Sequence, residues 1–204
     1  MQDKFRESTE QTMKMLGEYL EMSNSFMETE ALKYSMDAEL NNWALGMLDD
    51  DMTAMANVVK TTKSSLTSSQ KSNGLVSNIH IVPVAEKNVI STRKAADVGA
   101  IDPKGFLEEH LSDVPSAGKN PQKWIDHHDL LDETLGLDKE DYILSYQLLA
   151  QNKKYCVIID VSSEYYKTFL EEIDLGKGSI IGLVTENGRE LLYEAIEEGD
   201  ESAI

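Results

Sequence analysis

The hydrophobic pattern of the chain changes its period once, at the turn signal Asn73-Gly74. Between residues 3 and 70 there is no proline, and apolar residues recur at steps of three and four. This spacing gathers them on one side of a helix, and the segment is rich in Met, Leu, Glu, Ala and Lys, which favour helices. We therefore expect a helical arm over residues 1–72, in which the polar run Ser23-Asn24-Ser25 is the expected place for a break.

After the turn the pattern becomes that of short strands. β-branched and partly alternating segments predict strands at 75–84, 89–92, 142–150, 155–161, 179–185 and 190–196. An irregular insertion at 95–141 separates the second strand from the third and holds helical fragments at 105–111 and 124–135, and a further helix is expected at 164–173. This order predicts an α+β fold, in which residues 73–204 form a PAS-like antiparallel sheet of five to six strands with the helical insertion over one face.

Charge and composition exclude several classes of function. The chain has 37 acidic and 19 basic residues and a net charge of −18, so phosphate backbones would repel it and we expect no nucleic-acid partner. Its one cysteine, Cys156, can form neither an internal disulfide nor a CxxC metal site. No HExxH, GxSxG or phosphate-loop motif is present, so we expect neither an enzyme nor a cofactor. No apolar run is long enough to predict a membrane span or a signal peptide.

Three segments carry a resemblance to a known family: NGLVSNIHIVPVAEKNVIST at 73–92, DYILSYQLL at 141–149 and KKYCVIIDVSSEYYKTFLEEIDLGKGSIIGLVTENGRELL at 153–192. Together with the long N-terminal helix they resemble the Cache or PDC sensor domains of bacterial methyl-accepting chemotaxis receptors and sensor histidine kinases. The resemblance implies an extracytoplasmic domain that binds a small molecule. It also implies a parent receptor held in the cell membrane by segments outside this chain, and a homodimer formed through the N-terminal helix.

Asp160 is the first candidate for ligand binding, because it ends the apolar strand at 155–161. A partly desolvated carboxylate pairs strongly with a cation, and the family's amino-acid-binding members use an Asp at the matching position to hold the ligand's ammonium group. The ligand is therefore expected to be amine-bearing or amino-acid-like. The alternative is that Asp160 caps the helix that follows.

Aromatic residues and a histidine complete the expected site. Trp124, Tyr142 and Tyr146 could line a pocket, with core packing as the alternative. The family places an Arg two positions before the Trp to hold a ligand carboxylate, but this chain has Gln122 there. Lys123 or Arg93 could substitute, although a surface position is the expected interpretation of each. His128 is expected to face the cavity. It shares i, i+4 spacing with Asp132, but two ligands alone are too few to predict a metal centre.

A second class of function stays open at this stage. The chain could be a cytosolic PAS-like regulatory or protein-interaction module whose cavity is packed shut. Its binding surface would then be the helical arm, which holds all nine methionines, a residue common where helices pack against partners. The acidic run at residues 49–51 could bind a cation, but a solvated helix end is the expected interpretation.

Overall fold

The computed structural model describes residues 2–84, 88–93, 102, 104–106, 122–173, 180–184 and 190–195. The chain divides into two compact units, one formed by Met27–Ser162 and the other by Met1–Phe26 with Ser163–Ile204. The boundaries of these compact units differ from the expected boundary between a helical arm (residues 1–72) and a sensor domain (residues 73–204). The expected boundary separates parts by their role, and it stays a prediction.

The N-terminal third is helical, as the sequence predicts, in three pieces: α1 (Gln2–Ser35), α2 (Ala38–Ala44) and α3 (Met52–Ser72). Ser23-Asn24-Ser25 lies within α1, so the break expected there was wrong. α2 and α3 begin at aspartate caps, because a carboxylate oxygen accepts a hydrogen bond from a free amide of the first turn: Asp37 from Leu40 at 2.8 Å and Asp51 from Ala54 at 2.9 Å. The acidic run at 49–51 thus supplies a helix end, as expected.

None of the helices in the described residues is both long enough and apolar enough to cross a membrane.

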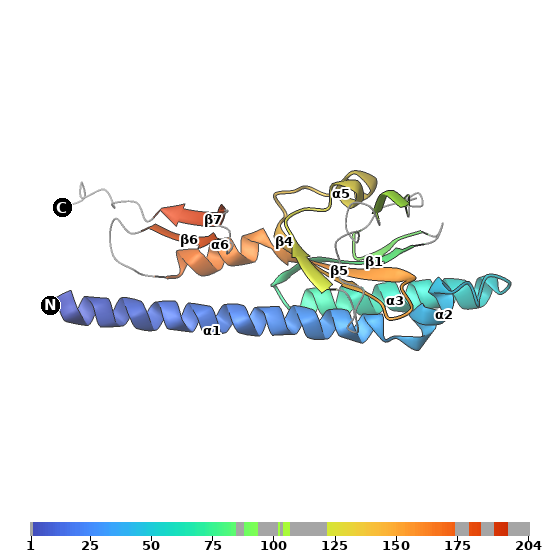
Figure 1. The fold of residues 1–204 in the computed structure, drawn as a ribbon, viewed down its shortest axis with the longest axis horizontal. Helices are drawn as coiled ribbons and strands as arrows, with labels where there is room; N and C mark the ends of the chain where they lie inside the picture. Colours follow the sequence, from blue (N-terminus) through green and yellow to red (C-terminus); the bar gives the residue numbers. More distant parts are fainter. Residues whose placement is uncertain are drawn as a thin grey trace. The chain divides into compact units, whose positions relative to one another are not determined.

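The larger unit is built on a five-stranded antiparallel sheet in the order β2-β1-β5-β4-β3. Its strands are β1 (Val76–Pro83), β2 (Ile90–Ser91), β3 (Gln122–Ile125), β4 (Tyr142–Leu149) and β5 (Tyr155–Ser162). α3 lies on one side of this sheet, and α5 (Asp129–Leu135) on the other (Figure 1). The fold is therefore the expected α+β class, consistent with a PAS-like sensor domain.

Two details differ from the prediction. Residues 122–125 form strand β3, whereas a helical fragment was expected from Trp124, because these four residues pair with β4 and tertiary pairing outweighs local propensity. The strands β6 (Ile180–Val184) and β7 (Glu190–Ala195) form a separate two-stranded sheet and do not extend the five-stranded one. The expected fragment at 105–111 lies largely outside the described residues.

The two faces of the five-stranded sheet are both buried but differ in chemistry. The first, which we call the helix face, is apolar and aromatic, and one of its side chains, Tyr155, donates a hydrogen bond to the carbonyl oxygen of Tyr34 in α1 at 2.9 Å. Its members are Ile79, Ile81, Leu144, Tyr146, Leu148, Tyr155, Val157, Ile159 and Val161. The opposite face, the insertion face, has an apolar part in which Val82, Leu149, Cys156 and Ile158 pack with Phe106, Leu131 and Leu135. The rest of the insertion face is polar.

The smaller unit contains the beginning of α1, the helix α6 (Ser163–Glu171) and the strands β6 and β7. Its core contains Leu16, Leu170 and Ile181. Tyr19 stacks on Phe169 with ring centroids 4.4 Å apart, and its hydroxyl forms a hydrogen bond with that of Tyr165.

Candidate functional site

A cluster of ionisable side chains lies on the insertion face, inside the larger unit. Asp160 is near the end of β5, His80 is in the middle of β1, and His128 directly precedes α5. All three side chains are fully buried. We call these three residues the His-Asp-His cluster.

The carboxylate of Asp160 lies at the centre of the cluster. Its Oδ1 lies 2.7 Å from Nε2 of His128 and accepts a hydrogen bond from Oγ of Ser145 at 2.7 Å, while its Oδ2 lies 2.9 Å from Nε2 of His80. Burial alone would raise the pKa of Asp160, but the two imidazoles beside it outweigh burial and hold that pKa well below its usual range. Three groups of the protein itself therefore satisfy this carboxylate.

His128 lies between two carboxylates. Besides its contact with Asp160, its Nδ1 lies 2.9 Å from Oδ1 of Asp132, so each ring nitrogen faces an acceptor. Burial lowers the pKa of His128, but the charges and hydrogen bonds of the two aspartates outweigh burial and raise that pKa to about 10. The ring is therefore an imidazolium at neutral pH.

Tyr142 reaches this cluster because β4 contains a bulge. The pairing shifts by one residue between Tyr142 and Leu144, which turns the tyrosine toward the insertion face. Its ring stacks on His128 with centroids 4.9 Å apart, and its hydroxyl donates to Oδ2 of Asp132 at 2.8 Å. An aromatic face over an imidazolium adds cation–π attraction.

The structure brings together three of the five expected site residues: His128, Tyr142 and Asp160. It does not bring Trp124 and Tyr146 to them. Those two form a cross-strand pair, with ring centroids 5.1 Å apart, on the helix face. Successive residues of a strand point to opposite faces, so Tyr146 lies on the face opposite that of Ser145 and Asp160.

His80 is the member of the cluster that the sequence prediction missed. Its Nδ1 lies 2.9 Å from Oγ of Ser91 in β2. The available signal was a histidine in the middle of the otherwise apolar run IHIVPV. Nothing in the sequence could place it beside Asp160, because the register of β1 against β5 joins residues 80 apart in the chain.

A second polar group on the insertion face lacks partners. Gln147 is 1% exposed, and neither its Nε2 nor its Oε1 has a hydrogen-bond partner among the residues that the structure describes. Lys123 is its cross-strand neighbour on the same face, and no ion pair joins this lysine to a described residue. Nδ1 of His127 is likewise buried and unpaired within the described part, and burial lowers the pKa of this imidazole. Buried amides without a partner are rare and costly, so Gln147 requires an explanation.

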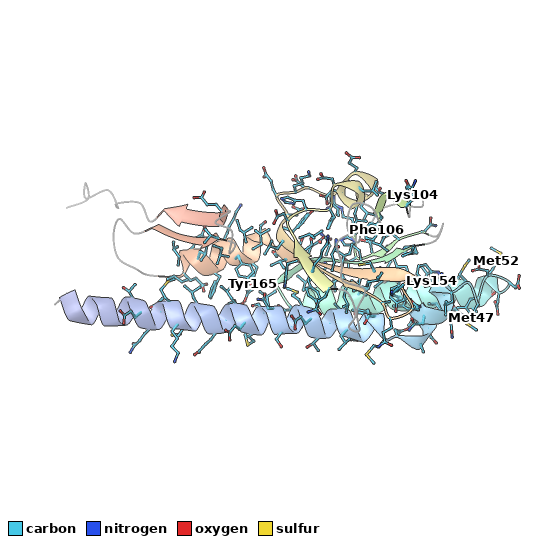
Figure 2. All side chains as sticks on the ribbon, viewed as in Figure 1. Met47, Met52, Lys104, Phe106, Lys154 and Tyr165 are labelled. Carbon is cyan, nitrogen blue, oxygen red and sulfur yellow. The ribbon has the colours of Figure 1, made fainter. Side chains whose placement is uncertain are left out.

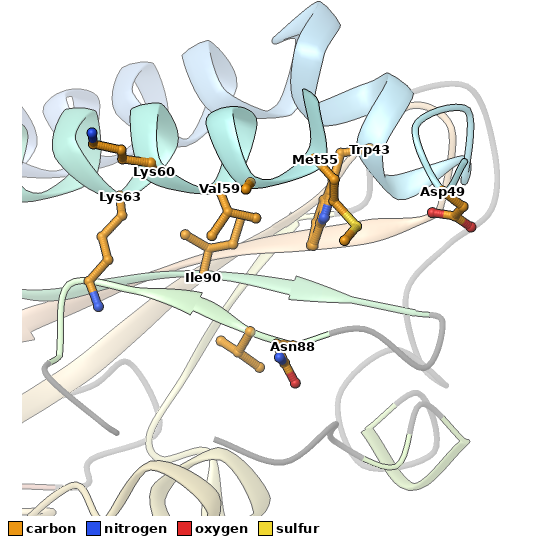
Figure 3. A pocket seen from close by; sticks show the side chains of 10 residues that line it. Trp43, Asp49, Met55, Val59, Lys60, Lys63, Asn88 and Ile90 are labelled. Atoms are coloured by element: carbon orange, nitrogen blue, oxygen red, sulfur yellow. The ribbon is translucent and has the colours of Figure 1, made fainter. Parts of the chain in front are cut away.

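A separate groove of about 660 Å³ lies between α3 and β2, away from the cluster (Figure 3). Trp43, Met55, Val59 and Ile90 supply its apolar lining, and Lys60 and Lys63 approach it from α3. None of the five expected site residues lines it.

Comparisons with known proteins add one structural likeness. No protein-family model and no curated protein matches the chain. Among solved structures, the chain is similar to the extracellular domain of the "putative histidine kinase rpHK1S-Z16", with 17% sequence identity and a TM-score of 0.46 over 85% of this chain and 71% of that one.

Proposed function

We propose that this chain is the extracytoplasmic sensor domain of a membrane receptor of the Cache or PDC type, such as a methyl-accepting chemotaxis protein or a sensor histidine kinase. It is a binding domain and not an enzyme. It holds a small polar ligand on the insertion face of the five-stranded sheet. The observation that carries the proposal is the amide of Gln147, which is buried on that face with no hydrogen-bond partner among the described residues.

The chemistry around Gln147 suggests which ligand group lies there. An amide can donate to and accept from a carboxylate or an amide, and the ammonium of Lys123 on the neighbouring strand adds positive charge on the same face. We assign the ligand's carboxylate or carbonyl group to this pair. An amine-bearing ligand fits Asp160 less well, because three protein groups already occupy its carboxylate.

A thermal-shift screen of amino acids, amines, carboxylates and purines tests the binding site. A ligand present at 100 times its Kd stabilises the native state by about 2.7 kcal/mol, which raises Tm by roughly 5–10 °C. The shift disappears in Gln147→Leu. The matched control is Gln151→Leu, which changes an exposed glutamine in the turn between β4 and β5 and keeps the shift. A shift that survives Gln147→Leu would contradict this site.

Location is tested in the full-length protein that contains this chain. Met47 is 70% exposed and lies near Met52 between α2 and α3 (Figure 2), so Met47→Cys offers an accessible thiol. Cys156 adds little background, since it is fully buried and burial raises the pKa of its thiol to about 12. A membrane-impermeant maleimide labels Met47→Cys in intact cells if the domain is extracytoplasmic. Labelling only after permeabilisation would favour the cytosolic module.

Dimerisation through the N-terminal helix belongs to the same proposal. Met15 and Met22 lie seven residues apart on α1 and are 69% and 61% exposed, a spacing that puts both on one side of the helix. We assign this surface to a second copy of the chain. Met22→Glu then shifts sedimentation toward the monomer, while Met47→Glu leaves the dimer unchanged. Equal sedimentation of both variants and the parent would contradict the assignment.

A further inference from the structure

We infer that the His-Asp-His cluster is a binding site for one divalent transition metal ion of the zinc type. One nitrogen each from His80 and His128 and one oxygen from Asp160 lie within 4.8 Å of one another. The three residues come from β1, β5 and the segment before α5, so the fold assembles them from distant parts of the sequence. This site is distinct from Gln147, and the inference does not depend on the proposed function.

The donor set selects the class of ion. Two imidazole nitrogens and one carboxylate oxygen are ligands that Zn²⁺, Co²⁺, Ni²⁺ and Cu²⁺ bind well. Mg²⁺ and Ca²⁺ prefer sites made of oxygen ligands alone. With three protein ligands, a fourth position is left for water or for the second oxygen of Asp160.

The surrounding polar contacts are those that a metal-binding histidine needs. Each imidazole directs Nε2 toward Asp160 and keeps Nδ1 for a supporting partner: Asp132 at 2.9 Å for His128, and Ser91 at 2.9 Å for His80. Tyr142 in turn holds Asp132 at 2.8 Å. A carboxylate behind a metal-bound histidine fixes the orientation of the ring and strengthens it as a ligand.

The distances require a small adjustment. The two Nε2 atoms now lie 2.7 and 2.9 Å from oxygens of Asp160, as in hydrogen bonds. Zinc bonds of about 2.0–2.2 Å at tetrahedral angles place neighbouring ligand atoms about 3.3–3.6 Å apart. The ion binds after the Nε2 atoms lose their protons, once each nitrogen separates from Asp160 by about half an ångström and the ligand atoms that are farthest apart, within 4.8 Å, approach one another by about an ångström.

Burial predicts slow exchange and a contribution to stability. All three ligand side chains are 0% exposed, so an ion enters during folding or through local opening. Because the ion binds the folded arrangement, its binding free energy adds to folding stability. Measurements must therefore allow hours of equilibration.

The test uses the chain freed of any affinity tag. Zinc content after equilibration and dialysis is measured by mass spectrometry, and Co²⁺ is added to chelator-treated protein while its visible absorption is recorded. We expect one ion per chain and the intense bands of four-coordinate cobalt. Asp160→Asn and His80→Asn abolish binding, and Asp132→Asn weakens it by about 10–100-fold because the supporting carboxylate is lost.

His127→Gln is the matched control, since it changes the histidine beside His128 that contacts none of the ligand atoms, and it retains one ion per chain. Circular dichroism checks that each variant folds, and the unaltered protein gives a result even if the variants do not fold. Less than a tenth of an ion per chain, or equal binding by Asp160→Asn and the unaltered protein, would overturn the inference.

Discussion

Both faces of the five-stranded sheet are buried, but different interactions stabilise them. On the helix face, residues such as Ile79, Val157 and Ile159 exclude water through apolar area. On the insertion face, buried charges of opposite sign at His128, Asp132 and Asp160 are stable because each one meets a partner. A conservative change in apolar packing lowers the free energy of unfolding only a little, whereas removal of one partner from a buried charge network lowers it strongly.

Removal of the Asp160 carboxylate is expected to have the largest effect on stability. Asp160→Ala leaves the imidazolium of His128 and the donors of His80 and Ser145 without their shared acceptor, so we expect the free energy of unfolding to fall by about 3–5 kcal/mol. Urea denaturation in the presence of a chelator measures it. Asp50→Ala, at an exposed position, is the control and stays within about 0.5 kcal/mol. A loss below 1 kcal/mol at Asp160 would mean that the network contributes little to stability.

The charge of His128 makes the stability of the chelator-treated protein depend on pH. The groups that face this ring are Asp132, Asp160, Tyr142 and His80. His127 packs on the same tyrosine. Since folding raises the pKa of His128 from 6.5 to about 10, its stabilisation is complete below pH 6.5 and is lost as the pH rises toward 10.

We therefore expect the urea midpoint to fall between pH 6.5 and 9. His128→Gln removes this part of the decline and serves as the control. Equal slopes for His128→Gln and the unaltered protein would show that His128 is not charged in the folded state.

Gln147→Leu is expected to stabilise the protein, whereas Asp160→Ala on the same face destabilises it. Replacing an unpaired buried amide by an apolar side chain of similar size removes an uncompensated desolvation cost, so the ligand-free protein gains about 1–3 kcal/mol. Urea denaturation of the ligand-free protein measures the gain. Gln151→Leu, at an exposed position in the turn between β4 and β5, is the control and leaves the stability nearly unchanged. A destabilised Gln147→Leu would mean that the amide has a partner in the free protein.

Ile159→Val, on the helix face, is expected to have the smallest effect on stability. The loss of one buried methylene costs about 0.5–1.5 kcal/mol, with no dependence on pH beyond that of the unaltered protein. Urea denaturation at pH 6.5 and pH 9 measures both. A pH-dependent loss would imply that the two faces are coupled through β5.

The sequence predicts the elements of this fold better than it predicts the cluster. The spacing of apolar residues predicts β1, β4 and β5, because a buried strand needs apolar residues at fixed intervals. The same spacing does not predict β3, because a strand of four residues is too short to show a pattern. Asp160 and His128 were expected at a site from their local context, but His80 depends on strand register and Tyr142 on a bulge. Trp124 and Tyr146 were grouped with Asp160 because composition alone does not say which face a side chain occupies.

The bulge in β4 lets the cluster accommodate one additional residue in this strand. Tyr142 and Ile143 together oppose Ser162, and Tyr142 thereby faces His128. A homologue without Ile143 would bring its tyrosine to the same face by simple alternation, whereas a homologue that kept the residue in regular pairing would turn the tyrosine to the helix face. A one-residue gap in an alignment at this strand is therefore compatible with the complete arrangement.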